Sequence, residues 1–201
     1  MHMRVLSPLL AFTLITIVTP SDHAAPQSGI ASSPTPLILN WSEGERRIRR
    51  PGTPNPEWPF TIKVDGQNGN AQDFYMLSEI MDPGQKIAFH KHHNAEEILI
   101  LEEGGATVIV GDKRATIGPH AVVFIPRETW VSVVNSGKES IHLYAVFSRQ
   151  GYEEYGRAIS VVQGQPATAM TADDIARARA SGHATYWDTS KGPYPPGVAR
   201  P

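Results

Sequence analysis

Two histidines and one glutamate in the middle of the chain have the types and spacing of a metal site. His90 and His92 are two residues apart, and Glu97 follows after a short polar stretch. On a β-strand, alternate residues share a face, so both imidazoles would point the same way, and a following strand that begins at Glu97 would bring its carboxylate beside them. Such a set with open coordination positions holds a divalent transition metal (Fe, Mn, Ni or Zn), and the open positions can bind substrate, dioxygen or water.

Other polar and aromatic residues near this group are candidates for supporting roles. His93 and Glu96 follow the opposite parity and are expected to face away. His142 opens a later predicted strand, where an inward side chain would supply a further ligand or act as a catalytic proton shuttle. Trp130 and Val131 are expected to shape the pocket wall, with Trp130 either stacking on a substrate or packing in the core.

Composition excludes several classes of function. The 201 residues include 18 Lys+Arg and 20 Asp+Glu, for a formal net charge of −2, so no basic surface is expected to bind nucleic acid. The chain has no cysteine, which excludes disulfides, thiolate metal sites and a cysteine nucleophile. It has no Gly-x-Ser-x-Gly motif, no P-loop and no dinucleotide fingerprint. Chemistry must therefore come from histidines and carboxylates.

The N-terminus has the layout of an export signal. Residues 1–25 carry one early positive charge at Arg4, an apolar stretch over Val5–Val18 and then small and polar residues. That stretch has 14 residues, fewer than the roughly 20 that span a bilayer, so no stable membrane span is expected. Residues 26–36 are predicted to be a flexible leader. We therefore expect a periplasmic or secreted protein, with a misassigned start codon or a retained anchor as the alternatives.

The region that must position the candidate ligands is predicted to be all-β. Residues 37–148 contain short β-branched and aromatic runs, interrupted by turn residues about every ten positions, which is typical of an antiparallel sandwich or barrel. The predicted strands are Phe60–Val64, Asp73–Ile80, Ile87–His92, Glu97–Leu101, Thr107–Val110, Arg114–Ile117, Val122–Ile125, Val131–Val134 and Ile141–Phe147.

The C-terminal quarter of the chain is expected to lie outside the barrel. Residues 149–183 are predicted to form an extension with one helix near Ala172–Ser181, because Thr171 and Asp174 form a capping box and Gly182 ends the helix. Residues 184–201 are rich in proline and glycine and are expected to be a loose tail, with Tyr186 and Trp187 able to dock on the barrel.

The stretch from Gly84 to Gly104 resembles the first motif of the cupins, which reads Gly, five residues, His-x-His, three or four residues, Glu, six residues, Gly. It resembles the quercetin-dioxygenase-like, single-domain bacterial members most. The resemblance implies a small jelly-roll barrel in which His90, His92 and Glu97 ligate the metal. The second cupin motif is degraded: Pro126 and Asn135 fit it, but Val131 stands where a fourth ligand, a histidine, belongs.

These observations leave three functions open. The first is metal-dependent chemistry on a small molecule, with dioxygenation as the commonest assigned reaction of the family. The second is a non-catalytic barrel that binds a small ligand, and the third is a metal-free isomerase or lyase with His90 or His142 as base. Cupin barrels often pair through edge strands, so a homodimer is expected.

A basic run over residues 46–50 belongs to none of these three functions. It contains Arg46, Arg47, Arg49 and Arg50 and could bind an anionic partner, but Glu43 and Glu45 partly neutralise it. A solvated edge strand protected by charge explains the run equally well.

Overall fold

A computed structural model describes residues 33–200 of the chain. The predicted export signal and most of the predicted leader lie outside the described residues. Within them, no helix has the length and apolar character that a bilayer crossing requires.

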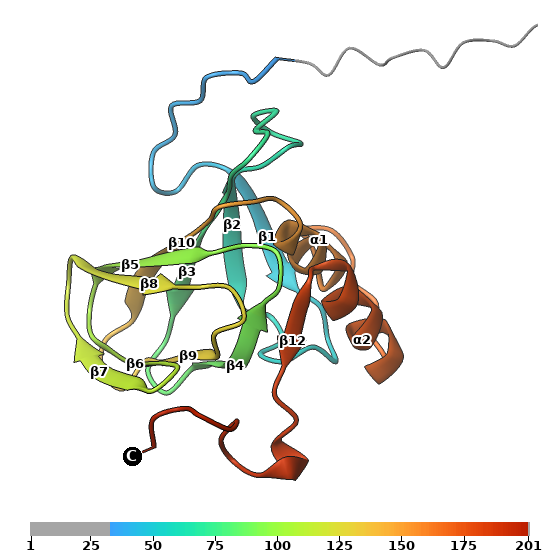
Figure 1. The fold of residues 1–201 in the computed structure, drawn as a ribbon. Coiled ribbons are helices and arrows are strands. Elements are labelled where there is room, and N and C mark those ends of the chain that lie inside the picture. Colours follow the sequence, from blue (N-terminus) through green and yellow to red (C-terminus); the bar gives the residue numbers. More distant parts are fainter. Residues whose placement is uncertain (1–32, 201) are drawn as a thin grey trace, which may run out of the picture. The chain divides into compact units, whose positions relative to one another are not determined.

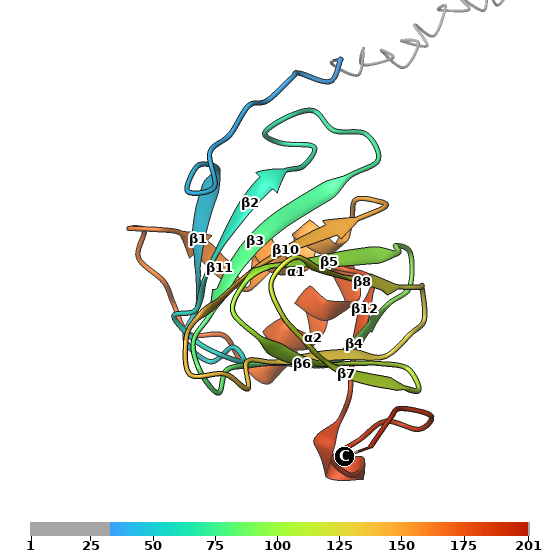
Figure 2. The same ribbon diagram turned by 90° about the vertical axis from the view of Figure 1, so that its left-hand side faces the viewer.

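Two antiparallel sheets face each other and form the barrel (Figures 1 and 2). The first sheet has seven strands in the order β11-β1-β2-β3-β10-β5-β8, and the second has five in the order β12-β4-β9-β6-β7. The prediction of an all-β jelly-roll barrel is thereby confirmed. The strands are β1 (Glu45–Arg49), β2 (Pro59–Val64), β3 (Tyr75–Met81), β4 (Lys86–His92), β5 (Glu97–Glu103), β6 (Ala106–Val110), β7 (Lys113–Ile117), β8 (Ala121–Ile125), β9 (Val131–Val134), β10 (Ile141–Phe147), β11 (Ser160–Val162) and β12 (Ala184–Tyr186).

Alternating side chains explain how the sheets enclose a core. In β3 and β10 every second residue is buried, as expected of strands with one face against the interior. Tyr75 and Phe147 are among the largest fully buried side chains, and their rings stack with centroids 5.2 Å apart. Gly104 ends β5 at φ +80°, and a Cβ at this position would lie 2.6 Å from Ile141. Only glycine fits this turn without strain.

The C-terminal segment packs on the barrel more closely than the sequence indicates. It contains α1 (Tyr152–Ala158), α2 (Ala172–Ser181) and a 3₁₀ turn over Thr189–Lys191. The helix α2 occupies the predicted range and starts with the predicted capping box of Thr171 and Asp174. In place of a loose tail, β12 pairs with β4, and Val198 is buried beside Phe89. Figure 1 shows β12 between β4 and the two helices.

The short helix α1 was not predicted. It has seven residues, includes Gly156 and starts without a side-chain cap, so its local sequence gives little helical signal. Packing holds it instead. Tyr155 lies in a second apolar cluster with Ile159, Met170 and Ala178, which joins α1 to α2.

Candidate metal centre

The candidate ligands come from both sheets and meet inside the barrel. His90 and His92 lie on β4 of the five-stranded sheet, and Glu97 begins β5 of the seven-stranded sheet. All three residues are buried, with 4%, 2% and 4% of their surface exposed. One ligand atom from each lies within 4.8 Å of the others. The sequence spacing therefore brings the three side chains together as predicted.

The loop between β4 and β5 fixes this arrangement. The Asn94 side-chain amide donates to the carbonyl of Gln150 at 3.1 Å. The backbone N–H of Glu96 donates to the Ser148 hydroxyl at 2.9 Å, and the Ser148 N–H donates back to the Glu96 carbonyl at 3.0 Å. These bonds tie the loop to the segment after β10 and set where β5 starts, and therefore where the Glu97 carboxylate lies.

The hydrogen bonding of His90 leaves one ring nitrogen for a ligand role. Its Nδ1–H donates to the carbonyl of Ala88 at 2.9 Å, so Nε2 carries the lone pair. Burial, together with the neighbouring His92, lowers the pKa of His90 to about 4. The ring is therefore neutral at physiological pH, as metal coordination requires.

Several polar atoms of this group lack hydrogen-bond partners in the described chain. Both ring nitrogens of His92 and Oε2 of Glu97 are buried and unpartnered, although His92 Nε2 lies 3.2 Å from Glu97 Oε2. Leaving such atoms unsatisfied costs about 1–3 kcal/mol each, more for a charged group. A cation bound between them would satisfy these atoms, so the donor set fits a divalent metal of the kind that imidazole and carboxylate bind.

Val131 occupies the place of a fourth ligand. It pairs with His90 across β4 and β9, is fully buried and lines the same cavity as His90 and Glu97. Its apolar side chain offers no donor atom, and among residues 33–200 the group has three members. A bound ion would therefore keep open positions on the cavity side, which is the pattern of a catalytic rather than a closed structural site.

Aromatic side chains from the C-terminal segment cover the ligands. The ring of Tyr186 on β12 stacks on His90, with centroids 5.2 Å apart, and the ring of Tyr152 on α1 meets the edge of His92 at 4.3 Å. The two hydroxyls are 2.7 Å apart and hydrogen-bonded. Burial raises the pKa of both tyrosines well above 10, so both hydroxyls stay protonated. These tyrosines restrict the access of water to the ligands.

The cavity beside the ligands measures about 50 Å³, room for roughly four water molecules. Apolar residues form much of its wall, including Leu77, Leu99 and Phe147. Arg49 and Glu79 add an ion pair to the lining, with Arg49 Nη2 and Glu79 Oε1 separated by 2.7 Å. Pro54 and Asn55, which are half-buried, also line it and mark its approach from solvent.

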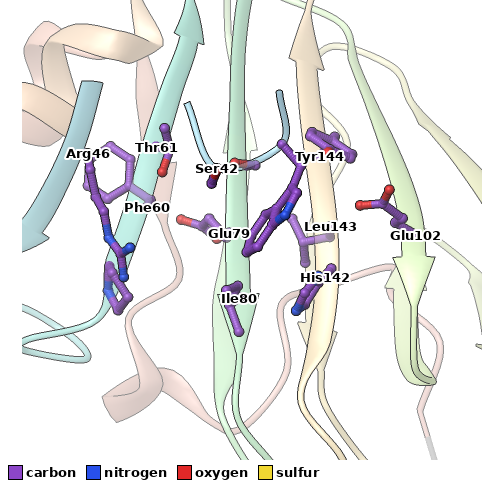
Figure 3. A pocket seen from close by; sticks show the side chains of 13 residues that line it. Ser42, Arg46, Phe60, Thr61, Glu79, Ile80, Glu102, His142, Leu143 and Tyr144 are labelled. Carbon is purple, nitrogen blue, oxygen red and sulfur yellow. The ribbon is translucent and has the colours of Figure 1, made fainter. Parts of the chain in front are cut away.

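Two candidate residues lie elsewhere. His142 is on the outer face of β10, where its ring stacks on Trp41 with centroids 5.3 Å apart and its Nδ1 lies 3.5 Å from Glu103. Figure 3 shows His142 with Tyr144 and Glu102 in a separate pocket on this face. His142 points outward because side chains alternate along β10 and Ile141, Leu143 and Ala145 take the inward positions. His142 is thus neither a ligand nor a base in the barrel cavity.

Trp130 also lies outside the cavity lining. Its ring lies edge to face with that of Trp187, with centroids 5.8 Å apart. The ammonium group of Lys91 lies over the Trp130 ring in a cation–π contact. It packs with the Phe89 cluster, on the side of β4 opposite the histidine ligands. The expectation that Trp130 shapes the pocket is not met, because its position just before β9 gives it the parity opposite to Val131.

The cavity-lining residues that the sequence did not indicate are Arg49, Glu79, Tyr152 and Tyr155. Glu79 gave a detectable signal, since it occupies an inward position between Leu77 and Met81 of β3. The tyrosines gave none, because they reach the cavity through packing of segments distant in sequence.

Comparison with known proteins agrees with this architecture. Residues 77–147 match the family model described as a cupin domain. Residues 77–147 thus form a cupin domain. The matched range begins in β3 and ends with β10, so it contains both strands of the candidate metal centre.

Several solved structures match part of the chain at low sequence identity. An oxalate decarboxylase from Lactobacillus farciminis is 22% identical, with a TM-score of 0.43 over 46% of this chain and 29% of that one. A predicted oxalate decarboxylase from Thermotoga maritima is 19% identical, with a TM-score of 0.49 over 57% of this chain and 100% of that one. The cupin domain of Schizosaccharomyces pombe Cnp3 is 20% identical, with a TM-score of 0.42 over 50% and 67%. The match to the Lactobacillus enzyme thus spans less than a third of its length. No curated protein matches the sequence.

Proposed function

We propose that this cupin is an exported, metal-dependent enzyme that acts on a small molecule, with dioxygenation as its reaction class. The observation that supports it best is the convergence of three buried ligand atoms, two of which have no other partner. His90, His92 and Glu97 would hold the ion and leave neighbouring positions free. An ion bound there would supply Lewis-acid or redox chemistry.

The chain's own residues then have distinct roles. Val131 and the apolar wall keep a space beside the ligands for a substrate. Tyr152 and Tyr186 lie against the two imidazoles and limit the entry of water. In a site with little water, charges and dipoles interact more strongly than in solvent, which favours catalysis over simple binding.

Metal analysis tests the proposal first. Untagged protein is reconstituted with iron, manganese, nickel or zinc, and we expect about one equivalent to remain bound. The variant His92→Ala should lose it, whereas His120→Asn, at an exposed turn, should retain it. Binding of less than about 0.1 equivalent by the wild type would reject the proposal.

Oxygen consumption separates an enzyme from a binding protein. A panel of flavonols, enediols and small hydroxy acids is offered to the metal-loaded wild type and to His92→Ala. Uptake by the wild type alone supports dioxygenation. Identical traces would favour the non-catalytic, small-molecule-binding cupin instead.

The proposed homodimer has support at one sheet edge. β8 is the terminal strand of the seven-stranded sheet, and its Val122 and Phe124 are 65% and 56% exposed. An exposed apolar edge strand is a site for pairing with another chain. We expect a dimer in sedimentation at micromolar concentration and a monomer for the double variant V122T/F124T. A monomeric wild type would contradict the homodimer.

Export is proposed from residues 1–25 and places the protein in the periplasm or the medium. Expression of the full chain in a bacterial host, followed by N-terminal sequencing of the fractionated protein, tests it. An intact N-terminus in the cytoplasmic fraction would reject this part of the proposal.

A further inference from the structure

Two arginines of the basic run, Arg47 and Arg49, turn into the protein, and Arg49 lies beside the ligand cavity. Arg46 of β1 is exposed, but the Arg49 side chain turns inward and is 14% exposed. Its guanidinium lies over the ring of Trp58, 4.7 Å from the centroid, and pairs with Glu79. Because removing such a pair from water is costly, its burial beside a cavity indicates a use beyond stability.

The guanidinium has a donor that the protein leaves unused. Arg49 Nε is buried and has no hydrogen-bond partner. Arg49 lines both the ligand cavity and a smaller neighbouring cavity of about 20 Å³. The fully buried Tyr75 lines that smaller cavity, and its hydroxyl is also without a partner. Two unsatisfied polar groups thus belong to residues that line one or both of these neighbouring cavities.

The charges in the cavity favour an anionic ligand once a metal is bound. Arg49 and Glu79 compensate each other, and Glu97 contributes one negative charge. A divalent ion held by Glu97 and two neutral imidazoles gives a net charge of about +1 in a buried space. A monoanion neutralises it, whereas a neutral ligand leaves the excess charge uncompensated.

We propose that the substrate of this cupin is a small monocarboxylate, bound at its carboxylate by Arg49 and directed by its other end toward the ion. The proposal rests on the function proposed above and names its substrate class. Arginine suits this role because its fixed fork of N–H donors matches a carboxylate. The cavity of about 50 Å³ has room for about four water molecules, which limits the acid to about two carbons.

Calorimetry on zinc-loaded protein tests the proposal without turnover. The probes are glycolate and its uncharged analogue glycolamide, which have nearly the same size. We expect the acid to bind at least tenfold more tightly than the amide to the zinc-loaded wild type. The metal-free protein should show no such preference, because its cavity has no positive excess.

Variants assign the preference to Arg49. The double variant R49M/E79M removes both charges together, so neither partner is left buried and unpaired. It should retain one zinc, and its preference for the acid should fall several-fold, to the part that the charge of the ion alone provides. E79Q retains Arg49 and should keep the preference. R49K keeps the positive charge but lacks the fork of guanidinium N–H donors, so its preference for the acid should fall several-fold. This variant provides a second test if R49M/E79M does not fold.

Equal binding of acid and amide by the zinc-loaded wild type, or no binding of either, would overturn the proposal. A preference that R49M/E79M leaves undiminished, or that R49K leaves unchanged when the double variant does not fold, would also overturn it. Zinc content is measured first on every sample. A wild type without zinc rejects the proposed function itself, whereas a zinc-loaded wild type without the preference rejects only the substrate class.

Discussion

Acid should destabilise the metal-free protein through His90. Its pKa in the folded protein is about 4, against 6.5 for an ordinary histidine, because burial and the neighbouring His92 oppose its charged form. The unfolded chain therefore takes up a proton first as the pH falls. The contribution of His90 to stability is complete above pH 6.5 and is lost between pH 6.5 and about 4. At about 1.4 kcal/mol per pH unit, the total loss is about 3 kcal/mol.

Urea unfolding between pH 7.5 and 4.5 measures this effect. The free energy of unfolding of the metal-free wild type should fall over this range. That of His90→Gln should fall by about 2.5 kcal/mol less, because this variant has no proton to take up at residue 90. His120→Asn serves as the control, since His120 is exposed at a left-handed turn that asparagine tolerates. Equal pH dependence in the wild type and His90→Gln would refute the reasoning.

Three further predictions follow from particular contacts. Val131→His places an imidazole opposite His90 and should tighten zinc binding at least tenfold, measured in competition with a chelator. Overpacking should lower the stability of the metal-free variant by about 1–3 kcal/mol. Unchanged zinc affinity would show that residue 131 does not reach the ion. Tyr152→Phe removes the hydrogen bond to Tyr186 and should lower the free energy of unfolding, measured by urea unfolding, by about 1 kcal/mol. No change would show that this bond is not formed in solution. Thr171→Ala removes the N-terminal cap of α2 and should lower the free energy of unfolding by about 1 kcal/mol, whereas Thr171→Ser should change it little. Equal decreases in the two variants would argue against capping.

Local pattern is enough to predict most of the barrel. The strands around the candidate ligands alternate buried and exposed residues and end at turn residues, so their ranges follow from the sequence with small shifts at the ends. The convergence of His90, His92 and Glu97 follows from strand parity and motif spacing. Parity also decides the position of His142, but a lone strand does not reveal which of its faces is buried.

Contacts between distant segments could not be predicted in this way. Tyr186 pairs with His90 only because β12 extends the edge of β4, and no local signal identifies that partner. Tyr152 reaches His92 through the packing of α1, a helix too short to have a clear pattern. Arg49 lies in a run of charges that is typical of a solvated strand, and its inward direction depends on Glu79 from another strand.

The central claim is that His90, His92 and Glu97 share one metal ion. Anomalous diffraction from crystals of the reconstituted protein, recorded above and below the absorption edge of the added metal, tests it most directly. We expect a single strong peak about 2 Å from His90 Nε2, one His92 ring nitrogen and one Glu97 oxygen, disappearing below the edge. A peak elsewhere, or no peak in protein that contains the metal, would contradict the claim.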